Sequence, residues 1–315
     1  MAKKIALIAI GGNALLKEKQ QGLQEEQLEN AAECAEMFAN VIQAGYSLCV
    51  VHGNGPQVGN ILIQQEAGSN RIPPYTLDIA DAMTQGSMGY MIERTLINRL
   101  RYINHACPVS TILTEVVVDK NDAGFQNPTK PVGPFYTEQR AQELAREKGW
   151  HMKEDAGRGY RKVVPSPKPL EIIQLEAVKT LLEAGHCVIA GGGGGIPVIR
   201  DGQGYLEGVE AVIDKDRLSS LLAEQLGADT YVILTGVPKV AVDFGKPSQK
   251  WLDRMTVTEA EKHMADGQFP AGSMGPKIEA AIQFIKAGGH EVLITSPEAL
   301  GHEPYETVGT RIVRD

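Results

Sequence analysis

Short runs of apolar residues alternate with amphipathic stretches along most of this chain. Each run is rich in β-branched or aliphatic residues and is four to nine residues long, which is typical of buried strands. The runs that predict strands cover residues 5–10, 47–51, 110–118, 187–190, 231–234 and 291–294.

The stretches between these runs follow the helical period. Apolar residues at Leu28, Ala31, Ala35, Phe38 and Ile42 repeat with the spacing of one helical face, and Gly45 marks where this helix should end. A second helix is predicted through the apolar positions of 278–285, ending at the glycine pair 288–289.

Strands and helices in alternation favour parallel pairing through right-handed crossovers. The predicted fold class is therefore α/β, with an open, mainly parallel sheet sandwiched by helices. Ligands of such sheets bind at the carboxyl ends of the strands. In this chain four strand ends are followed by glycine, at 11–13, 52–55, 191–195 and 235–236.

Residues 119–169 break this alternation. The segment is rich in Pro, Gly and Lys, and it also contains one predicted helix at 137–148 and a charged stretch at 154–162. We interpret it as a small protruding subdomain inserted into a main domain formed by 1–118 and 170–315, because a structureless loop of this length is uncommon in a compact protein.

Composition adds limits on the partners of this protein. The 315 residues are 43% hydrophobic and 22% charged, with a net charge of -8, so no basic surface is expected to recruit nucleic acid or an anionic membrane. No apolar run reaches the length of a membrane span, and the four cysteines form no CxxC pair. A reducing cytoplasm is the expected compartment.

The glycine-marked strand ends have a possible chemical use. Residues without Cβ let backbone N–H groups approach a phosphate, and a following helix start adds its dipole. The alternative is that these glycines only allow tight turns, and for any one loop the two interpretations are equally good. Neither GxGxxG nor GxxxxGK[ST] occurs in the chain, so dinucleotide enzymes and P-loop ATPases are disfavoured.

Phosphoryl transfer without a P-loop needs cations from elsewhere in the chain. Three lysines have unusual neighbours: Lys130 lies between prolines, Lys215 lies between Asp214 and Asp216, and Lys277 follows a Gly-Ser-Met-Gly-Pro segment. The Asp-Lys-Asp triplet is equally typical of a helix start, and both interpretations can hold together. Most lysines are solvated surface charges, so position alone does not assign a role.

Several segments resemble carbamate kinases of the amino acid kinase superfamily, and the resemblance runs through essentially the whole chain. The NPTKP and EDAGRGYR stretches in the inserted region favour carbamate kinase over its relatives in the superfamily. The matching segments are IGGNAL at 10–15, HGNGPQVG at 52–59, NPTKPVG at 127–133, EDAGRGYR at 154–161, VPSPKP at 164–169, GGGGIPV at 192–198, GVEAVIDKD at 208–216, ILTGV at 233–237 and GSMGPKIEAA at 272–281.

The resemblance implies a reversible phosphoryl transfer between carbamoyl phosphate and ADP, giving ATP and carbamate, with Mg²⁺ accompanying the nucleotide and no metal site of the protein's own. It also implies a homodimer. The N-terminal half would bind carbamate and the C-terminal half the nucleotide. The implied phosphate and acceptor residues are Gly11, Gly12, Asn13, Gly53 and Asn54, and the implied catalytic residues are Lys130, Lys215, Asp216 and Lys277.

On the nucleotide side, the resemblance implies contacts from Asp214, Thr235, Gly236, Val237, Phe244 and Met274. Phe244 departs from the Tyr that is frequent at this position, which affects only a hydroxyl contact. Two alternatives stay open. One is a kinase of the same superfamily with another acceptor, such as acetylglutamate or a phosphate ester, and the other is a nucleotide-binding sensor without turnover.

Overall fold

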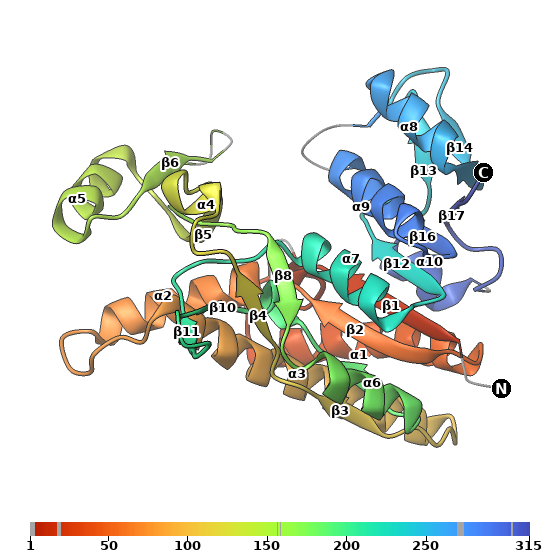
Figure 1. The fold of residues 1–315 in the computed structure, drawn as a ribbon, viewed down its shortest axis with the longest axis horizontal. Coiled ribbons are helices and arrows are strands. Elements are labelled where there is room, and N and C mark those ends of the chain that lie inside the picture. The colour runs from red at the N-terminus through yellow and green to blue at the C-terminus, as the bar shows by residue number, and fades with distance from the viewer. Residues whose placement is uncertain (1–3, 18–19, 156, 158, 270–273, 304) are drawn as a thin grey trace.

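The computed structural model describes residues 4–17, 20–155, 157, 159–269, 274–303 and 305–315. Its centre is a large sheet in which β1 lies between β2 and β12 (Figure 1). Neighbouring strands are parallel except for the antiparallel pair β16 and β17. In spatial order the strands are β15 Arg254–Thr256, β17 Thr310–Val313, β16 Glu291–Thr295, β12 Thr230–Leu234, β1 Ile5–Ile10, β2 Ser47–His52, β9 Cys187–Ile189 and β3 Val109–Thr111.

Helices cover both faces of this sheet, as the alternation in the sequence predicted. Side chains of β1 divide between two cores, because Ala6, Ile8 and Ile10 point to one face and Leu7 and Ala9 to the other. The first face is covered by α1 Gln24–Gln43, α3 Leu77–Tyr102 and α10 Pro297–His302. The second is covered by α6 Leu175–Glu183, α7 Lys215–Leu226, α8 Val257–Ala265 and α9 Met274–Lys286.

The predicted strand 110–118 is two strands in two sheets, which corrects that prediction. β3 ends at Thr111, and β4 (Glu115–Val118) joins a second sheet. The break falls at the buried Thr114, whose backbone N–H donates to the Gln85 side chain at 2.8 Å and so leaves the strand ladder. Hydropathy could not reveal this break, because apolar residues at 112–113 and 116–118 stand on either side of it.

The second sheet extends from the main domain toward the inserted segment. Its strands are ordered β11, β10, β4 and β8, with bounds Leu206–Gly208, Ile196–Arg200, Glu115–Val118 and Pro169–Ile172. A small hairpin of β13 (Val240–Val242) and β14 (Lys250–Leu252) lies beyond α8. The described chain also contains two short 3-10 helices, η1 Gly12–Ala14 and η2 Gly192–Gly194.

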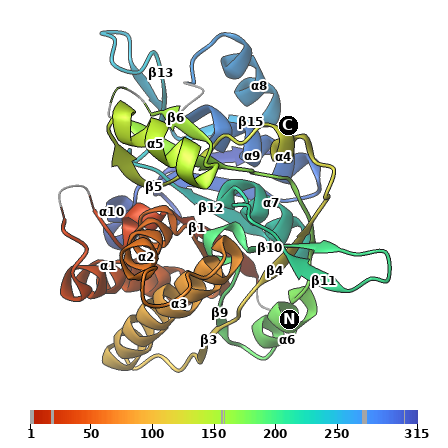
Figure 2. The same cartoon turned by 90° about the vertical axis from the view of Figure 1, so that its left-hand side faces the viewer.

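Most of the inserted segment forms a separate unit that stands out beside the main body, above α2 (Gly55–Gly68) (Figures 1 and 2). It contains a three-stranded sheet in the order β5, β7, β6 together with the helices α4 and α5. A small apolar cluster that includes Val58, Leu77, Val132 and Val164 joins it to α2 and α3. Its elements are α4 Ala123–Gln126, β5 Lys130–Tyr136, α5 Glu138–Lys148, β6 Met152–Glu154 and β7 Tyr160–Val164.

Candidate functional site

Three glycine loops meet at the carboxyl ends of β1, β2 and β9. A Cβ on Gly53 would lie 2.8 Å from the Gly12 backbone nitrogen, and a Cβ on Gly12 would lie 3.2 Å from the Asn54 nitrogen. Gly193 has a positive φ of 72° and approaches the Asn54 side chain too closely for any larger residue. These glycines are therefore required for close backbone packing, which also brings N–H groups of separate loops to one place.

The helix α2 begins at this meeting point. Its N-cap residue, Asn54, makes no side-chain capping bond to the first turn. The amide nitrogen of Asn54 instead donates at 2.8 Å to both Asp81 and Thr84, which are buried on α3. Because the cap is absent, first-turn N–H groups of α2 are available to an anion at the positive end of the helix dipole.

The α7 helix also begins here, at the Asp214-Lys215-Asp216 triplet. The Asp214 side chain caps it by accepting from the backbone N–H groups of Asp216 and Arg217. The Cδ atom of Lys215 would lie 3.3 Å from a Cβ on Gly53, so this lysine runs along the glycine loops. The triplet thus starts a helix and also presents charge to the site, as both sequence interpretations allowed.

Two lysines gather around Asp216. The Lys215 ammonium lies 2.5 Å from one carboxylate oxygen of Asp216, and the Lys277 ammonium lies 3.8 Å from the other. The pKa of Lys277 is below its ordinary value, mainly because the side chain is buried. The Asp216 carboxylate raises this pKa, and the Lys215 ammonium lowers it further. The carboxylate therefore keeps two neighbouring, half-buried ammonium groups in place.

The third lysine reaches the same helix end from the protruding unit. Lys130, the first residue of β5, forms a 2.8 Å ion pair with Asp214. Burial by itself would raise the pKa of Asp214, but the Lys130 ammonium and the capping N–H groups lower it to about 2. Lys130, Lys215 and Lys277 are therefore all held by carboxylates at the start of α7, although they are distant in sequence.

The other residues predicted for nucleotide contacts have fewer polar contacts than the lysines at the start of α7. Thr235, Gly236 and Gly11 line one cavity of about 880 Å³ at the ends of β1, β12 and β16. Met274 begins α9, three residues before Lys277, and packs partly against the core. Phe244 lies in the turn after β13, is 58% exposed and contacts the Trp251 ring edge-on at 6.1 Å. Val237 is half-buried in the segment after β12.

Two parts of the predicted site fall outside the described structure. The Asn13 side chain is one, although its backbone belongs to η1. Gly272 and Ser273, which precede Met274 in the glycine-rich segment, are the other. No position is therefore assigned to these groups.

Sequence reasoning missed a buried polar network behind the glycine loops. Gln85 on α3 donates to the backbone carbonyls of Thr114 and Gly192 and accepts from the N–H of Thr114. Asp81 is only 1% exposed, and its second carboxylate oxygen has no hydrogen-bond partner in the described residues. Burial raises the pKa of Asp81 to about 8, against the lowering effect of its bond from Asn54.

His52 is the histidine next to a glycine loop, and its environment indicates a structural role. The ring is buried, and its Nδ1 contacts the Gly53 carbonyl at 3.1 Å. Burial lowers the pKa of His52 to about 4, so the ring is neutral near pH 7 and donates one hydrogen bond to the loop.

The described residues contain no cluster of three or more His, Cys, Asp or Glu side chains that could hold a metal ion. Asp214 and Asp216, the carboxylates at the site, are both occupied by lysines. This donor set suits a cation that arrives with phosphate groups better than one held by the protein. Among these residues, no helix has the length and apolarity needed to cross a membrane.

Comparison with known proteins agrees with this geometry. The model of the amino acid kinase family matches residues 4–296. The chain therefore belongs to the amino acid kinase family. Within that family, carbamate kinases are among the relatives that match nearly the whole chain. The enzyme of Thermococcus kodakarensis is 49% identical over 99% of this chain and all of its own length, and that of Clostridium perfringens is 48% identical over 91% of this chain and 92% of its own.

Solved structures give the same result. Carbamate kinase from Giardia lamblia bound to AMP-PNP superposes with a TM-score of 0.91 at 42% identity and covers 99% of each chain. N-acetylglutamate synthase from Neisseria gonorrhoeae matches with a TM-score of 0.59 at 15% identity, over 99% of this chain and 62% of its own, which shows a shared fold alone. The predicted fold class and family resemblance are thereby confirmed.

Proposed function

We propose that this protein is a phosphotransferase that catalyses reversible transfer of a phosphoryl group between carbamoyl phosphate and ADP, giving ATP and carbamate. The observation that carries the proposal is the grouping of Lys130, Lys215 and Lys277 at the start of α7, beside the glycine loops. Supporting evidence comes from the full-length carbamate kinase relatives and from the Giardia neighbour, which was solved with AMP-PNP.

The proposed mechanism is an in-line transfer without a covalent enzyme intermediate. The backbone N–H groups at Gly11 and Gly12 cradle the phosphoryl group, and the ammonium groups of Lys215 and Lys277 offset its negative charge as it moves. Gly53 lets these loops approach each other closely, while its own N–H donates to the Ile10 carbonyl at 2.8 Å. Such fixed charges stabilise a transition state because no reorganisation is needed when the charge develops. Carbamate is already an anionic nucleophile, so the chain needs no general base.

Lys130 has a different proposed role, because it comes from the protruding unit. Its ammonium would exchange part of its ion pair with Asp214 for the phosphate of the bound substrate. Asp216 would act on the reaction through the two lysines that it positions, and Asn54 would orient the acceptor from the start of α2. Thr235, Gly236, Val237, Phe244 and Met274 form the proposed nucleotide side.

The metal proposed for this reaction is Mg²⁺, bound to the phosphates of ATP or ADP. When bound, Mg²⁺ would neutralise part of the phosphate charge of the nucleotide. The residues of this chain contribute the ammonium groups and backbone N–H groups around those phosphates.

We also propose that the chain forms a homodimer through the outer face of α3. Ile79, Met83 and Tyr90 are 42%, 42% and 59% exposed, and their spacing places them on one side of this long helix. Exposed apolar side chains gathered on one face are typical of interfaces between subunits. Sedimentation of the purified chain at its dimer mass supports this assembly, and a monomer contradicts it.

A coupled assay of ATP formation tests the proposed activity. The protein is given ADP with carbamoyl phosphate, acetyl phosphate or acetylglutamyl phosphate, and ATP is followed by a luminescent reaction. The proposal expects carbamoyl phosphate to give the largest kcat/KM. Preference for another donor would identify a different kinase of the family, and nucleotide binding without turnover of any donor would identify a sensor.

A further inference from the structure

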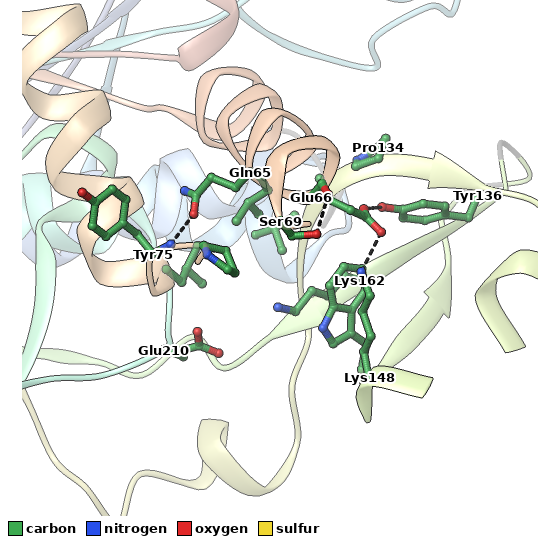
Figure 3. Close-up of a pocket in the computed structure, with 15 residues that line it drawn as sticks. Gln65, Glu66, Ser69, Tyr75, Pro134, Tyr136, Lys148, Lys162 and Glu210 are labelled. Carbon is green, nitrogen blue, oxygen red and sulfur yellow. Dashed lines mark hydrogen bonds and ion pairs between the residues drawn. The ribbon is translucent and has the colours of Figure 1, made fainter. Parts of the chain in front are cut away.

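A second cavity lies away from the phosphoryl-transfer site, between α2 and the protruding unit (Figure 3). Its volume is about 350 Å³, which is within the range of small-molecule pockets. It is bounded by the end of α2, the segment before α3, strands β5 and β7, and the end of α5. None of the residues proposed for phosphoryl transfer or nucleotide binding lines it.

One wall of this cavity is apolar and well packed. Leu62, Leu77 and Val132 belong to the cluster that joins the protruding unit to α2 and α3, or pack against it, and Pro74 and Pro134 extend the apolar surface. Leu77 and Val132 are 2% and 3% exposed, so their positions are fixed by the fold. The wall offers an apolar body a preformed surface.

The opposite side carries two lysines that stand over one indole ring. The ammonium groups of Lys148 and Lys162 each lie 4.7 Å from the centre of the Trp150 ring. Lys148 is neutralised, because it forms a 2.7 Å ion pair with Glu66, whose other oxygen accepts from the Tyr136 hydroxyl at 3.5 Å. These contacts account for the charge of Lys148 and Glu66 (Figure 3).

Lys162 is different. In the part of the chain that the structure describes, its ammonium has no carboxylate at ion-pair distance and lies over the Trp150 ring. Burial lowers the pKa of Lys162, the more distant Glu210 carboxylate at the rim opposes that effect, and Lys148 adds to it. A half-buried ammonium that is not directly paired with a carboxylate is a site for an anion.

A second polar group in the wall is also unsatisfied. The Gln65 side-chain oxygen accepts from the Tyr75 backbone N–H at 2.5 Å, but its amide nitrogen is buried and has no partner in the described residues. The Gln65 nitrogen points toward Tyr75 and away from the Lys162 ammonium (Figure 3), so the two donors do not share one acceptor. The Lys162 ammonium is therefore the donor that an anion in the cavity would meet.

The charge count restricts the anion. Among the described residues that line the cavity, only the Lys162 ammonium has no carboxylate at ion-pair distance. The carboxylates of Glu66 and Glu210 border the same cavity, so a doubly charged phosphate would meet repulsion. Lys148 and Lys162 cover the Trp150 ring. The apolar part of a bound molecule would therefore pack against Leu62, Leu77 and Val132. We propose that this cavity binds a small monocarboxylate with an apolar or aromatic body, with its carboxylate on Lys162.

The position of the cavity gives such a ligand structural importance. Lys162 on β7 pairs directly with Val132 on β5, and Lys130 lies two residues before Val132 on the same side of that strand. A molecule held between Lys162 and α2 would contact both the main domain and the strand that carries Lys130. It would therefore hold the protruding unit against the main domain.

Binding of phenylacetate to the full chain, measured by isothermal titration, tests this proposal without depending on turnover. We expect saturable binding that is lost for benzylamine, which has the same ring but a positive charge. Saturating ADP should leave the binding unchanged. Displacement of phenylacetate by ADP, or equal binding of benzylamine, would overturn the proposal.

Substitutions of lysine assign the site. Lys162→Met, which keeps the length of the side chain, should weaken phenylacetate binding by about tenfold or more, because a hydrogen bond to a charged group is lost. Lys162→Arg should retain binding, which guards against a folding defect in the first variant. Lys153→Met is the matched control, since Lys153 is an exposed lysine of the same small sheet outside the cavity. Unchanged affinity in Lys162→Met contradicts the assignment.

Discussion

The main domain and the protruding unit both supply lysines to the start of α7, and they hold them differently. Lys215 and Lys277 come from helices that pack on the large core, and they share Asp216. Lys130 comes from β5, which meets the main domain through a small apolar cluster, and it is 35% exposed against 18% for Lys277. Lys215 and Lys277, the core lysines, are therefore held in place before substrate binds. The position of Lys130 depends on how the protruding unit packs against the main domain.

This difference separates two contributions to catalysis. Groups fixed before the reaction stabilise charge that develops in the transition state and so act on kcat. A group that docks with the substrate contributes to binding of the ground state as well and acts largely on KM. We therefore expect substitution of Lys215 or Lys277 to change mainly kcat and substitution of Lys130 to change mainly KM, although all three lysines lie at the start of α7.

The largest effect is expected from the core lysines. Lys277→Ala and Lys215→Ala should each lower kcat by roughly 10²-fold or more, because one preorganised charge donor is removed. Steady-state kinetics of ATP formation measure this loss. Lys286→Ala, an exposed lysine at the other end of α9, is the matched control and should keep full activity. Near-normal kcat in both core variants would remove the distinction between the two regions.

Loss of Lys130 is expected to be milder and of a different kind. Lys130→Ala should raise the KM for carbamoyl phosphate by about tenfold, with a smaller change in kcat, because a charge contact with the bound phosphate is lost. Initial rates at varied carbamoyl phosphate give both constants, and Lys153→Ala on β6 serves as the control from the same unit. An unchanged KM would show that Lys130 does not meet the substrate.

The glycine loops test the rigidity of the core side. Gly53→Ala should lower kcat/KM by about tenfold or more, because its Cβ would lie 2.8 Å from the Gly12 nitrogen and would displace the loop that faces the phosphoryl group. Gly68→Ala, at the other end of α2, should be nearly neutral, since a Cβ there has no heavy atom within 4 Å. Equal effects of the two substitutions would show that loop packing does not set the rate.

A prediction of a different kind is on stability rather than turnover and concerns Asp81, which fixes Asn54. Its pKa is about 8 in the folded protein and about 3.9 when unfolded, so between these values only the folded state keeps the proton. This group therefore makes the wild type less stable as pH rises through that window, by about 1.4 kcal/mol per pH unit. Asp81→Asn lacks this dependence and should gain stability relative to wild type.

Urea denaturation from about pH 5 to about pH 8 measures that gain. The free-energy difference between Asp81→Asn and the wild type should grow steadily as pH increases. Parallel stability curves for the two proteins would mean that Asp81 is ionised in the folded state and is stabilised by a partner.

Much of the fold was predictable because strongly apolar runs form the central strands. β1, β2, β9, β12 and β16 follow their predicted runs to within one residue at each end. The break at Thr114 was not predictable, since it depends on a hydrogen bond from Gln85, which is remote in sequence. Residues of α3 such as Asp81 and Gln85 escaped notice because polar residues on a helix usually face solvent.

The residue types of the site could be predicted from the sequence, but the ion pairs between them could not. Glycine loops and unusual lysines are visible in the sequence, and the family resemblance groups them. The partner of each lysine is not visible, because Lys130 meets Asp214 across 84 residues of sequence. The cavity beside Lys162 was equally hidden, since its walls come from separate segments that meet only when the protruding unit packs on α2. The roles of the individual site residues remain predictions.

The most direct test of the central claim is the affinity for ADP with and without aluminium fluoride, which mimics the transferring phosphoryl group. In the wild type, with carbamate present, the fluoride complex should tighten ADP binding strongly. Lys215→Ala and Lys277→Ala should lose most of that tightening. Retention of the full tightening in both variants would contradict the account, because the charge in transit would then be stabilised by other groups.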